Sequence, residues 1–225
     1  MGPRAEVDET DELRAADGRV PGRRGMATRQ RLLDCTLELL KATSYRELKV
    51  VDIAREAGTS PATFYQYFPD VEAAILVVAE EMAKEGTALA ALVRDATWKG
   101  RKGYESASAL VDGFMDFWER HRSVLRVVDL ATEEGDERFH QIRVRVLNEL
   151  TEAMREVIEE FQRAGRHPAD EDPMATAGVL VSMLAHVAAK RYGFEFWGIR
   201  TDDLEHSMAR VVYWSITSQK PPASS

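Results

Sequence analysis

Apolar side chains recur at helical spacing along most of this 225-residue chain, and no stretch shows a sustained alternation of apolar and polar residues. Most prolines and glycines lie between the periodic segments, where they would end helices. The pattern predicts an all-α fold of about nine helices. The expected helices cover about residues 28–43, 50–57, 61–68, 71–85, 104–121, 124–132, 136–164, 173–192 and 201–218.

Composition excludes several other classes of protein. No apolar run approaches the ~18 residues that a membrane-spanning helix needs, and the acidic first 17 residues lack the apolar centre of a secretory signal. Cys35 is the only cysteine, so the chain cannot form an internal disulfide, and a buried, inert thiol is expected there. We therefore expect a cytoplasmic protein that does not contact a membrane.

Charge is distributed unevenly along the sequence. The net charge of the whole chain is −8, but residues 18–70 carry +3, whereas residues 1–17 carry −4 and the remainder −7. A basic segment in an otherwise acidic protein fits either a nucleic-acid surface or a solvated linker. An acidic body would be repelled by phosphate, so we expect it to face away from any bound nucleic acid.

Residues 50–68 have the pattern of two short helices joined by a tight turn. Ala54 is small enough for a close crossing of the two helices, and Gly58 can adopt the positive φ that the turn requires. Ser60 offers a hydroxyl to cap the second helix, and Pro61 occupies its first position, where a missing N–H costs nothing. Phe64 would anchor this helix in a core. An ordinary helical hairpin remains the alternative interpretation.

With the segments around it, this motif resembles the DNA-binding domain of the tetracycline-repressor (TetR) family. The matching stretches are residues 28–40, 53–68 and 72–75. The resemblance implies a helix-turn-helix DNA-binding domain over 26–72 and a ligand-binding and dimerisation domain over 73–220. Residues 1–25 are rich in charge, glycine and proline and are expected to form a disordered tail, with a short second tail over 221–225. The resemblance also implies a transcriptional regulator, most often a repressor that a ligand releases from its operator.

The second helix of such a motif lies in the major groove, where its N-terminal half meets base edges. Carried over by position, the resemblance implies that DNA is contacted by Arg29, Lys49, Thr59, Ser60, Pro61, Ala62, Thr63, Tyr65 and Tyr67. Two positions depart from the family pattern. Asp70 lies where a lysine often follows Phe68, and Lys49 stands where a hydroxyl residue usually caps the first helix of the motif. Arginines before Met26 could compensate by lying along the phosphates.

The segment 174–192 is apolar nearly all round and rich in small residues, so it must be buried on more than one side. In the resembled family, the last two helices form a four-helix bundle across a two-fold axis. We therefore expect a homodimer, with closure of the monomer's own core as the alternative.

The middle and later helices are rich in aromatic residues, which could line a pocket for a mainly hydrophobic effector such as a lipid or an acyl thioester. Aromatic residues at helical spacing are also typical of an ordinary core. The candidate ligand-binding residues are Phe114, Phe117, Trp118, His121, Met154, Met183, His186, Tyr192 and Trp197.

The sequence does not favour an enzyme. It contains no glycine-rich phosphate loop, no metal-ligand spacing and no Gly-x-Ser-x-Gly motif, and no cofactor is expected. Glu133, Glu134, Asp136 and His140 lie close together, but a solvated acidic loop is a better interpretation than a metal site. A second alternative is a protein-interaction module that has kept the helix-turn-helix and lost its affinity for DNA.

Overall fold

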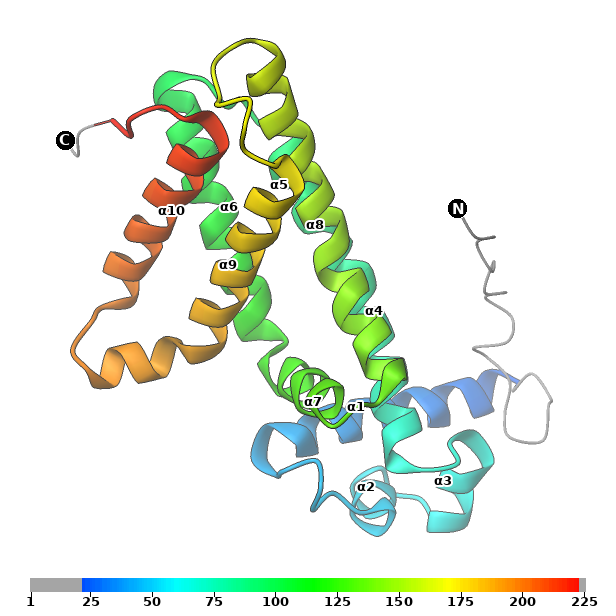
Figure 1. The fold of residues 1–225 in the computed structure, drawn as a ribbon. Coiled ribbons are helices and arrows are strands. Elements are labelled where there is room, and N and C mark those ends of the chain that lie inside the picture. Colours follow the sequence, from blue (N-terminus) through cyan, green and yellow to red (C-terminus); the bar gives the residue numbers. More distant parts are fainter. Residues whose placement is uncertain (1–21, 223–225) are drawn as a thin grey trace. The chain divides into compact units, whose positions relative to one another are not determined.

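The computed structural model describes residues 22–222, and this part of the chain is helical without strands (Figure 1). It contains nine helices of seven or more residues, a four-residue helix and a short 3-10 helix. The all-α prediction is therefore confirmed. The helices are α1 (Arg23–Ala42), α2 (Val50–Glu56), α3 (Pro61–Tyr67), α4 (Val71–Gly86), η1 (Thr87–Ala90), α5 (Ala91–Arg94), α6 (Gly100–Arg120), α7 (Arg122–Glu133), α8 (Glu137–Arg163), α9 (Pro173–Phe196) and α10 (Thr201–Thr217).

The chain divides into two compact units, and the first joins two separate segments of sequence. Unit 1 holds the described residues up to Glu81 together with Ser123–Phe139. Helix α1 packs against α2 and α3, which also pack against each other. Their buried core is made by Leu32, Leu33, Ile53, Ala54 and Phe64.

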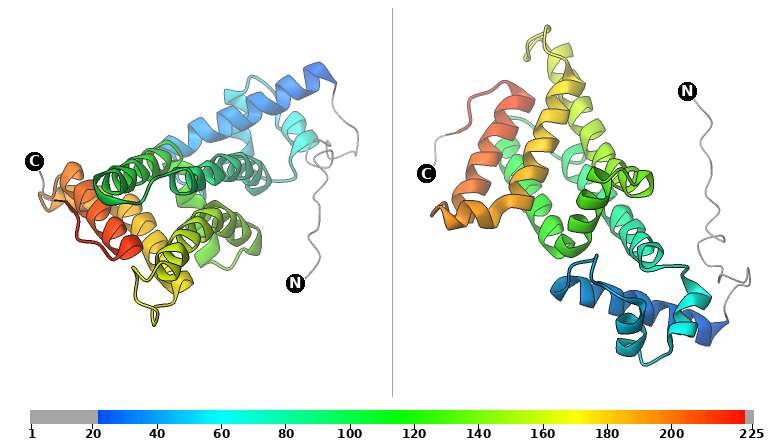
Figure 2. Two further views of the ribbon diagram at one scale, coloured as in Figure 1. Left: turned by 90° about the horizontal axis from the view of Figure 1, so that it is seen from above. Right: turned by 60° about the horizontal axis from the view of Figure 1, so that its bottom comes forward.

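Unit 2 consists of Met82–Arg122 and the chain from His140 onward. Helix α6 packs against α9 and α10, which lie side by side (Figure 2). The side chains that fill this unit come mainly from α6, α8, α9 and α10. The sequence predicted a domain boundary near residue 72, which would place α7 in the second domain. In the structure α7 groups with the first helices instead.

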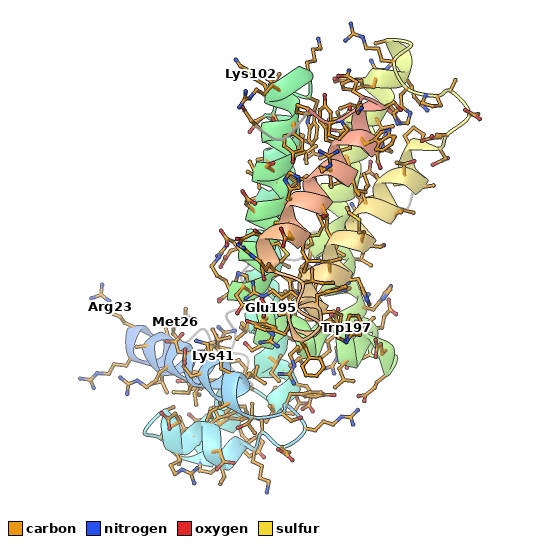
Figure 3. All side chains as sticks on the ribbon, turned by 90° about the vertical axis from the view of Figure 1, so that its left-hand side faces the viewer. Arg23, Met26, Lys41, Lys102, Glu195 and Trp197 are labelled. Atoms are coloured by element: carbon orange, nitrogen blue, oxygen red, sulfur yellow. The ribbon has the colours of Figure 1, made fainter. Side chains whose placement is uncertain are left out.

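The first helix is longer than the sequence pattern suggested. Helix α1 begins at Arg23, five residues before the expected start, and the Thr28 hydroxyl donates to the carbonyl of Arg24, at 3.1 Å. Arg23 therefore extends from the end of a helix (Figure 3). The rest of the expected N-terminal tail, residues 1–21, lies outside the described residues, as do residues 223–225. The short helices η1 and α5 were not expected.

Helix α9 bends near its end, so its last turns run at an angle to the rest of the helix (Figures 1 and 2). By length and composition alone it could cross a membrane, and one third (33%) of its most apolar window is buried in the fold. The expectation that no apolar segment approaches this length was thus too strong. Ser182 and His186 lie on the exposed side of this helix.

Candidate nucleic-acid interface

The turn between α2 and α3 has the geometry that its sequence predicts. Gly58 has a φ of +65°, in the left-handed region that only glycine adopts readily. The amide of Thr59 donates to the carbonyl of Ala54 at 2.8 Å, which closes the end of α2. Ser60 Oγ accepts from the amide of Thr63 at 3.2 Å, and Pro61 is the first residue of α3. These local interactions fix the direction in which α3 leaves the turn.

Helix α3 is held in unit 1 by aromatic residues on one side. Phe64 is fully buried, and its ring lies 5.5 Å from that of Phe68, which is also buried. Tyr65, the next residue after Phe64, has 52% of its surface exposed. The helix therefore has a clear inner and outer side, and the outer side is free to contact another molecule.

The predicted contact residues of α3 and its turn lie on or beside this outer side. Ser60, Pro61, Ala62 and Tyr65 are exposed. Thr59, Thr63 and Tyr67 are half-buried. The hydroxyl of Thr63 lies 3.0 Å from that of Ser60, so these two side chains form one polar group.

Gln66 was missed by the sequence interpretation. It is exposed and stands four residues after Ala62, which places both on the same helical face. This four-residue spacing could have identified Gln66 from the sequence. A glutamine amide can donate to and accept from one base edge, a combination suited to adenine.

Arg29 does not belong to the exposed surface, which corrects the expectation that it approaches DNA from α1. Only 7% of its surface is exposed, and its guanidinium lies over the Phe68 ring, 5.3 Å from the centroid. It therefore supports the packing of α1 against the end of α3. Lys49 is exposed and precedes α2 without capping it through its side chain, as the sequence suggested.

Several of the basic residues in this segment are paired with carboxylates. Arg55 binds Asp52 at 2.7 Å, and Arg46 forms an ion pair with Glu134. These pairs reduce the positive charge that is available to phosphate. Arg23 and Arg24 are both exposed in the first turn of α1, and they add two positive charges outside α2 and α3.

Asp70 has a structural role that explains its departure from the family pattern. Its Oδ1 accepts from the amide of Ala73 at 2.7 Å, at the start of α4. A carboxylate in this position satisfies a free amide of the helix and interacts favourably with the helix dipole.

Cys35 is half-buried in α1 rather than fully buried. Burial raises the pKa of its thiol, and the nearby carboxylate of Glu56 raises it further. A thiol with a raised pKa is a poor nucleophile, which agrees with the expectation of an inert cysteine.

In unit 2, part of the predicted ligand-binding set forms a buried cluster. Phe114 and Trp118 of α6 are stacked with ring centroids 5.4 Å apart, and the Arg143 guanidinium of α8 lies 5.5 Å from the Trp118 ring. Phe117 lies against the end of α4: a methyl group added at Gly86 would come within 3.2 Å of its ring. Met154 is also buried in this unit, and Met183 is half-buried.

His121 connects two helices of unit 2. Its Nε2 lies 3.0 Å from Glu85 Oε2 near the end of α4, and its ring centroid lies 4.7 Å from that of Phe117. The same carboxylate oxygen accepts from Arg120 at 3.1 Å. His121 therefore stands beside the aromatic cluster and joins α4 to the end of α6.

The structure does not bring His186, Tyr192 and Trp197 into this cluster. His186 is exposed on α9, and 74% of the Trp197 surface is exposed at the end of that helix (Figure 3). Tyr192 donates to Glu119 at 2.9 Å, and its ring lies 4.2 Å from the Arg122 guanidinium. Tyr192 thus ties α9 to the end of α6. Helical spacing shows which residues share a face, but not whether that face turns inward.

Carboxylates also face one another between α6 and α10. Burial raises the pKa of Asp112, and the charge of Asp116 raises it further. The pKa of Glu205 is raised by burial and then by Asp112. Among residues 22–222, no group of three or more His, Cys, Asp or Glu side chains is arranged to hold a metal ion.

Two family models match separate parts of this chain. A model of bacterial regulatory proteins of the tetR family matches residues 32–73, and a model of the tetracyclin repressor-like C-terminal domain matches residues 89–223. The first match contains the α2–α3 motif, and the second covers more than half of the chain.

Individual relatives agree with these matches. A Haemophilus influenzae protein described as an uncharacterized HTH-type transcriptional regulator is 28% identical over 132 residues, which are 58% of this chain and 63% of that protein. The matched part therefore spans less than two thirds of that relative's length.

Solved structures show the same fold. A TetR-family transcriptional regulator from Rhodococcus sp. has a TM-score of 0.65 and 16% identity, over 85% of this chain and 100% of its own. FadR from Bacillus subtilis, solved in complex with stearoyl-CoA, has a TM-score of 0.61 and 14% identity, over 83% of this chain and 97% of its own.

Proposed function

This chain belongs to the tetracycline-repressor family of transcriptional regulators, with a DNA-binding helix-turn-helix and a C-terminal ligand-binding domain, and we propose that it is a repressor. In this proposal a homodimer binds a palindromic operator and releases it when a mainly hydrophobic small molecule binds unit 2. The observation that carries the DNA-binding part is the arrangement of α2 and α3, with Phe64 buried and a row of polar side chains exposed.

Each candidate contact residue has a proposed role. Thr59, Thr63 and Gln66 contact base edges, while Ala62 packs against a thymine methyl group. Ser60, Pro61, Tyr65, Tyr67 and Lys49 position the helix against the phosphates and sugars. Arg23 and Arg24 extend the phosphate contacts beyond α2 and α3. A regulator that uses these contacts will bind DNA less tightly as salt concentration rises.

Replacing Thr63 by valine tests base recognition, because valine has nearly the same shape and lacks the hydroxyl. We expect about a fivefold loss of affinity per half-site, corresponding to one hydrogen bond, and so about 25-fold for the dimer on its operator, with little change on unrelated DNA. The measurement is a gel shift with the promoter region of the protein's own gene at several salt concentrations. An equal loss on both DNAs would show that Thr63 contacts only the backbone, and wild-type binding that is insensitive to salt would contradict the phosphate contacts.

The effector site is proposed at the buried aromatic cluster of unit 2. The candidate lining comprises Phe114, Phe117, Trp118, His121, Met154 and Met183. Arg143, next to Trp118, supplies a positive charge that would suit an acidic head group. Occupation of this cluster would alter the contacts of Phe117 and His121 with the end of α4. Release of the operator requires that the ligand bind the two states unequally, by about 1–3 kcal/mol or more.

Stearoyl-CoA is a suitable first probe, because the FadR neighbour was solved with that molecule. At a concentration of about 100 times its dissociation constant, a ligand stabilises the native state by about 2.7 kcal/mol, which corresponds to roughly 5–10 °C in melting temperature for a chain of this size. We expect such a shift with stearoyl-CoA and none with acetyl-CoA, which has the same head group. No shift with either, and no release of the operator, would contradict a long-chain acyl effector.

A further inference from the structure

The turn between α7 and α8 belongs to the same compact unit as the helix-turn-helix, although about fifty residues separate it from Glu81 in sequence. The turn has a fixed shape: Gly135 has a φ of +89°, and the amide of Asp136 donates to the carbonyl of Ala131 at 2.9 Å. The sequence interpretation had treated these residues as a solvated acidic loop. In the structure Glu134 contacts the segment that precedes α2.

Glu134 binds the segment that leads into α2. The hydroxyl of Tyr45 donates to Glu134 Oε2 at 3.1 Å, and the Arg46 guanidinium forms an ion pair with Glu134 Oε1. Tyr45 also takes part in the local turn, since its carbonyl accepts from the amide of Leu48, a buried residue immediately before Lys49. One carboxylate therefore holds two consecutive side chains just ahead of the motif.

Arg138 lies in the first turn of α8, directly after the α7–α8 turn. Its guanidinium binds both carboxylate oxygens of Asp136, at 3.1 and 2.7 Å, which fixes its direction. Asp136 is the main cause of the raised pKa of Arg138, and the charges of Asp70 and Glu72 raise it further. Those two acidic residues stand directly after α3, at the start of α4.

We propose that Glu134 is a positioning residue for DNA binding, which braces the entry of the α2–α3 motif from the α7–α8 turn. The proposal rests on the function proposed above, because it concerns how α3 is presented to an operator. Glu134 does not need to touch DNA. It restrains the segment before α2 through Tyr45 and Arg46.

The test compares Glu134→Arg with Glu133→Arg, which changes the charge by the same amount at the adjacent exposed position of α7. Relative to this control, we expect Glu134→Arg to lower operator affinity by up to about fivefold per half-site, the upper end for an exposed ion pair, with nearly unchanged affinity for unrelated DNA. Amide hydrogen exchange of the free protein should become faster over residues 44–57. The melting temperature should stay close to that of the control.

A double-mutant cycle tests whether Glu134 acts through its partners. In the Tyr45→Phe/Arg46→Ala background, Glu134→Arg should cause no further loss of operator affinity and no further increase in exchange. If Glu134→Arg and Glu133→Arg behave alike in both measurements, or if the effects simply add in the cycle, the brace does not exist. Hydrogen exchange in the free protein tests the brace even if the wild type binds no operator. Failure of the wild type to bind any operator would overturn the proposed function, not the brace.

Discussion

Replacing Trp214 by glutamate is expected to separate the proposed homodimer into monomers and to lower operator affinity by about 100-fold or more, because the two half-sites are then bound independently. Trp214 has 62% of its surface exposed on α10, and Val211 is exposed one turn before it. On the adjacent α9, Val179 is exposed, and Gly178 has open space where a side chain would extend. Exposed apolar residues that cluster on two neighbouring helices mark an interaction surface.

The physical reason for the large effect is the cost of burying a charge. A carboxylate placed in an apolar contact must lose its water without gaining a partner. Because Trp214 is mostly exposed in the single chain, the same substitution should leave the fold of the monomer almost unaffected. Molar mass from light scattering, together with gel shifts on full and half operators, measures both consequences.

Val144→Glu is the matched control, since Val144 is also an exposed apolar residue of unit 2 but belongs to α8. It should remain dimeric and retain operator affinity. If Trp214→Glu is dimeric and binds the operator as well as this control does, the contact between subunits lies elsewhere than on the outer faces of α9 and α10.

The parts of the fold that were predicted well from sequence are those encoded within a few consecutive residues. The positive φ of Gly58, the cap from Ser60 and the position of Pro61 each depend on neighbours less than one helical turn away. The burial of Phe64 also followed from helical spacing within the motif. Local rules of this kind also gave the number and approximate positions of the long helices.

The errors arose where distant contacts decide the outcome. Arg29 was expected on the DNA side, but α1 packs so that its guanidinium lies over Phe68, a residue nearly 40 positions later. Trp197 and His186 are residue types that often line pockets, yet both are exposed in the structure. The role of Glu134 depends on Tyr45, 89 residues earlier in the chain. Periodicity in one segment contains no information about such pairings.

Phe64→Ala is expected to abolish operator binding by unfolding unit 1. Phe64 is fully buried at the centre of the contact between α3 and the first two helices, and removal of such a ring typically costs about 3–5 kcal/mol. That is a large share of the stability of a small unit. Hydrogen exchange should show lost protection over α1 to α3, while the buried amides of α6 and α10 in unit 2 keep theirs.

Tyr65→Ala, at the next position of the same helix, should have the opposite profile. Its side chain is largely exposed, so protection in unit 1 should remain close to that of the wild type. Operator affinity should nevertheless fall, by about 1 kcal/mol or roughly fivefold per half-site for one lost hydrogen bond to a phosphate, and so about 25-fold for the dimer. If Tyr65→Ala bound the operator like the wild type, the outer side of α3 would not face DNA. If Phe64→Ala kept its protection, the ring would not be the anchor of the motif. The adjacent pair therefore separates the residue that builds the recognition helix from the one that uses it.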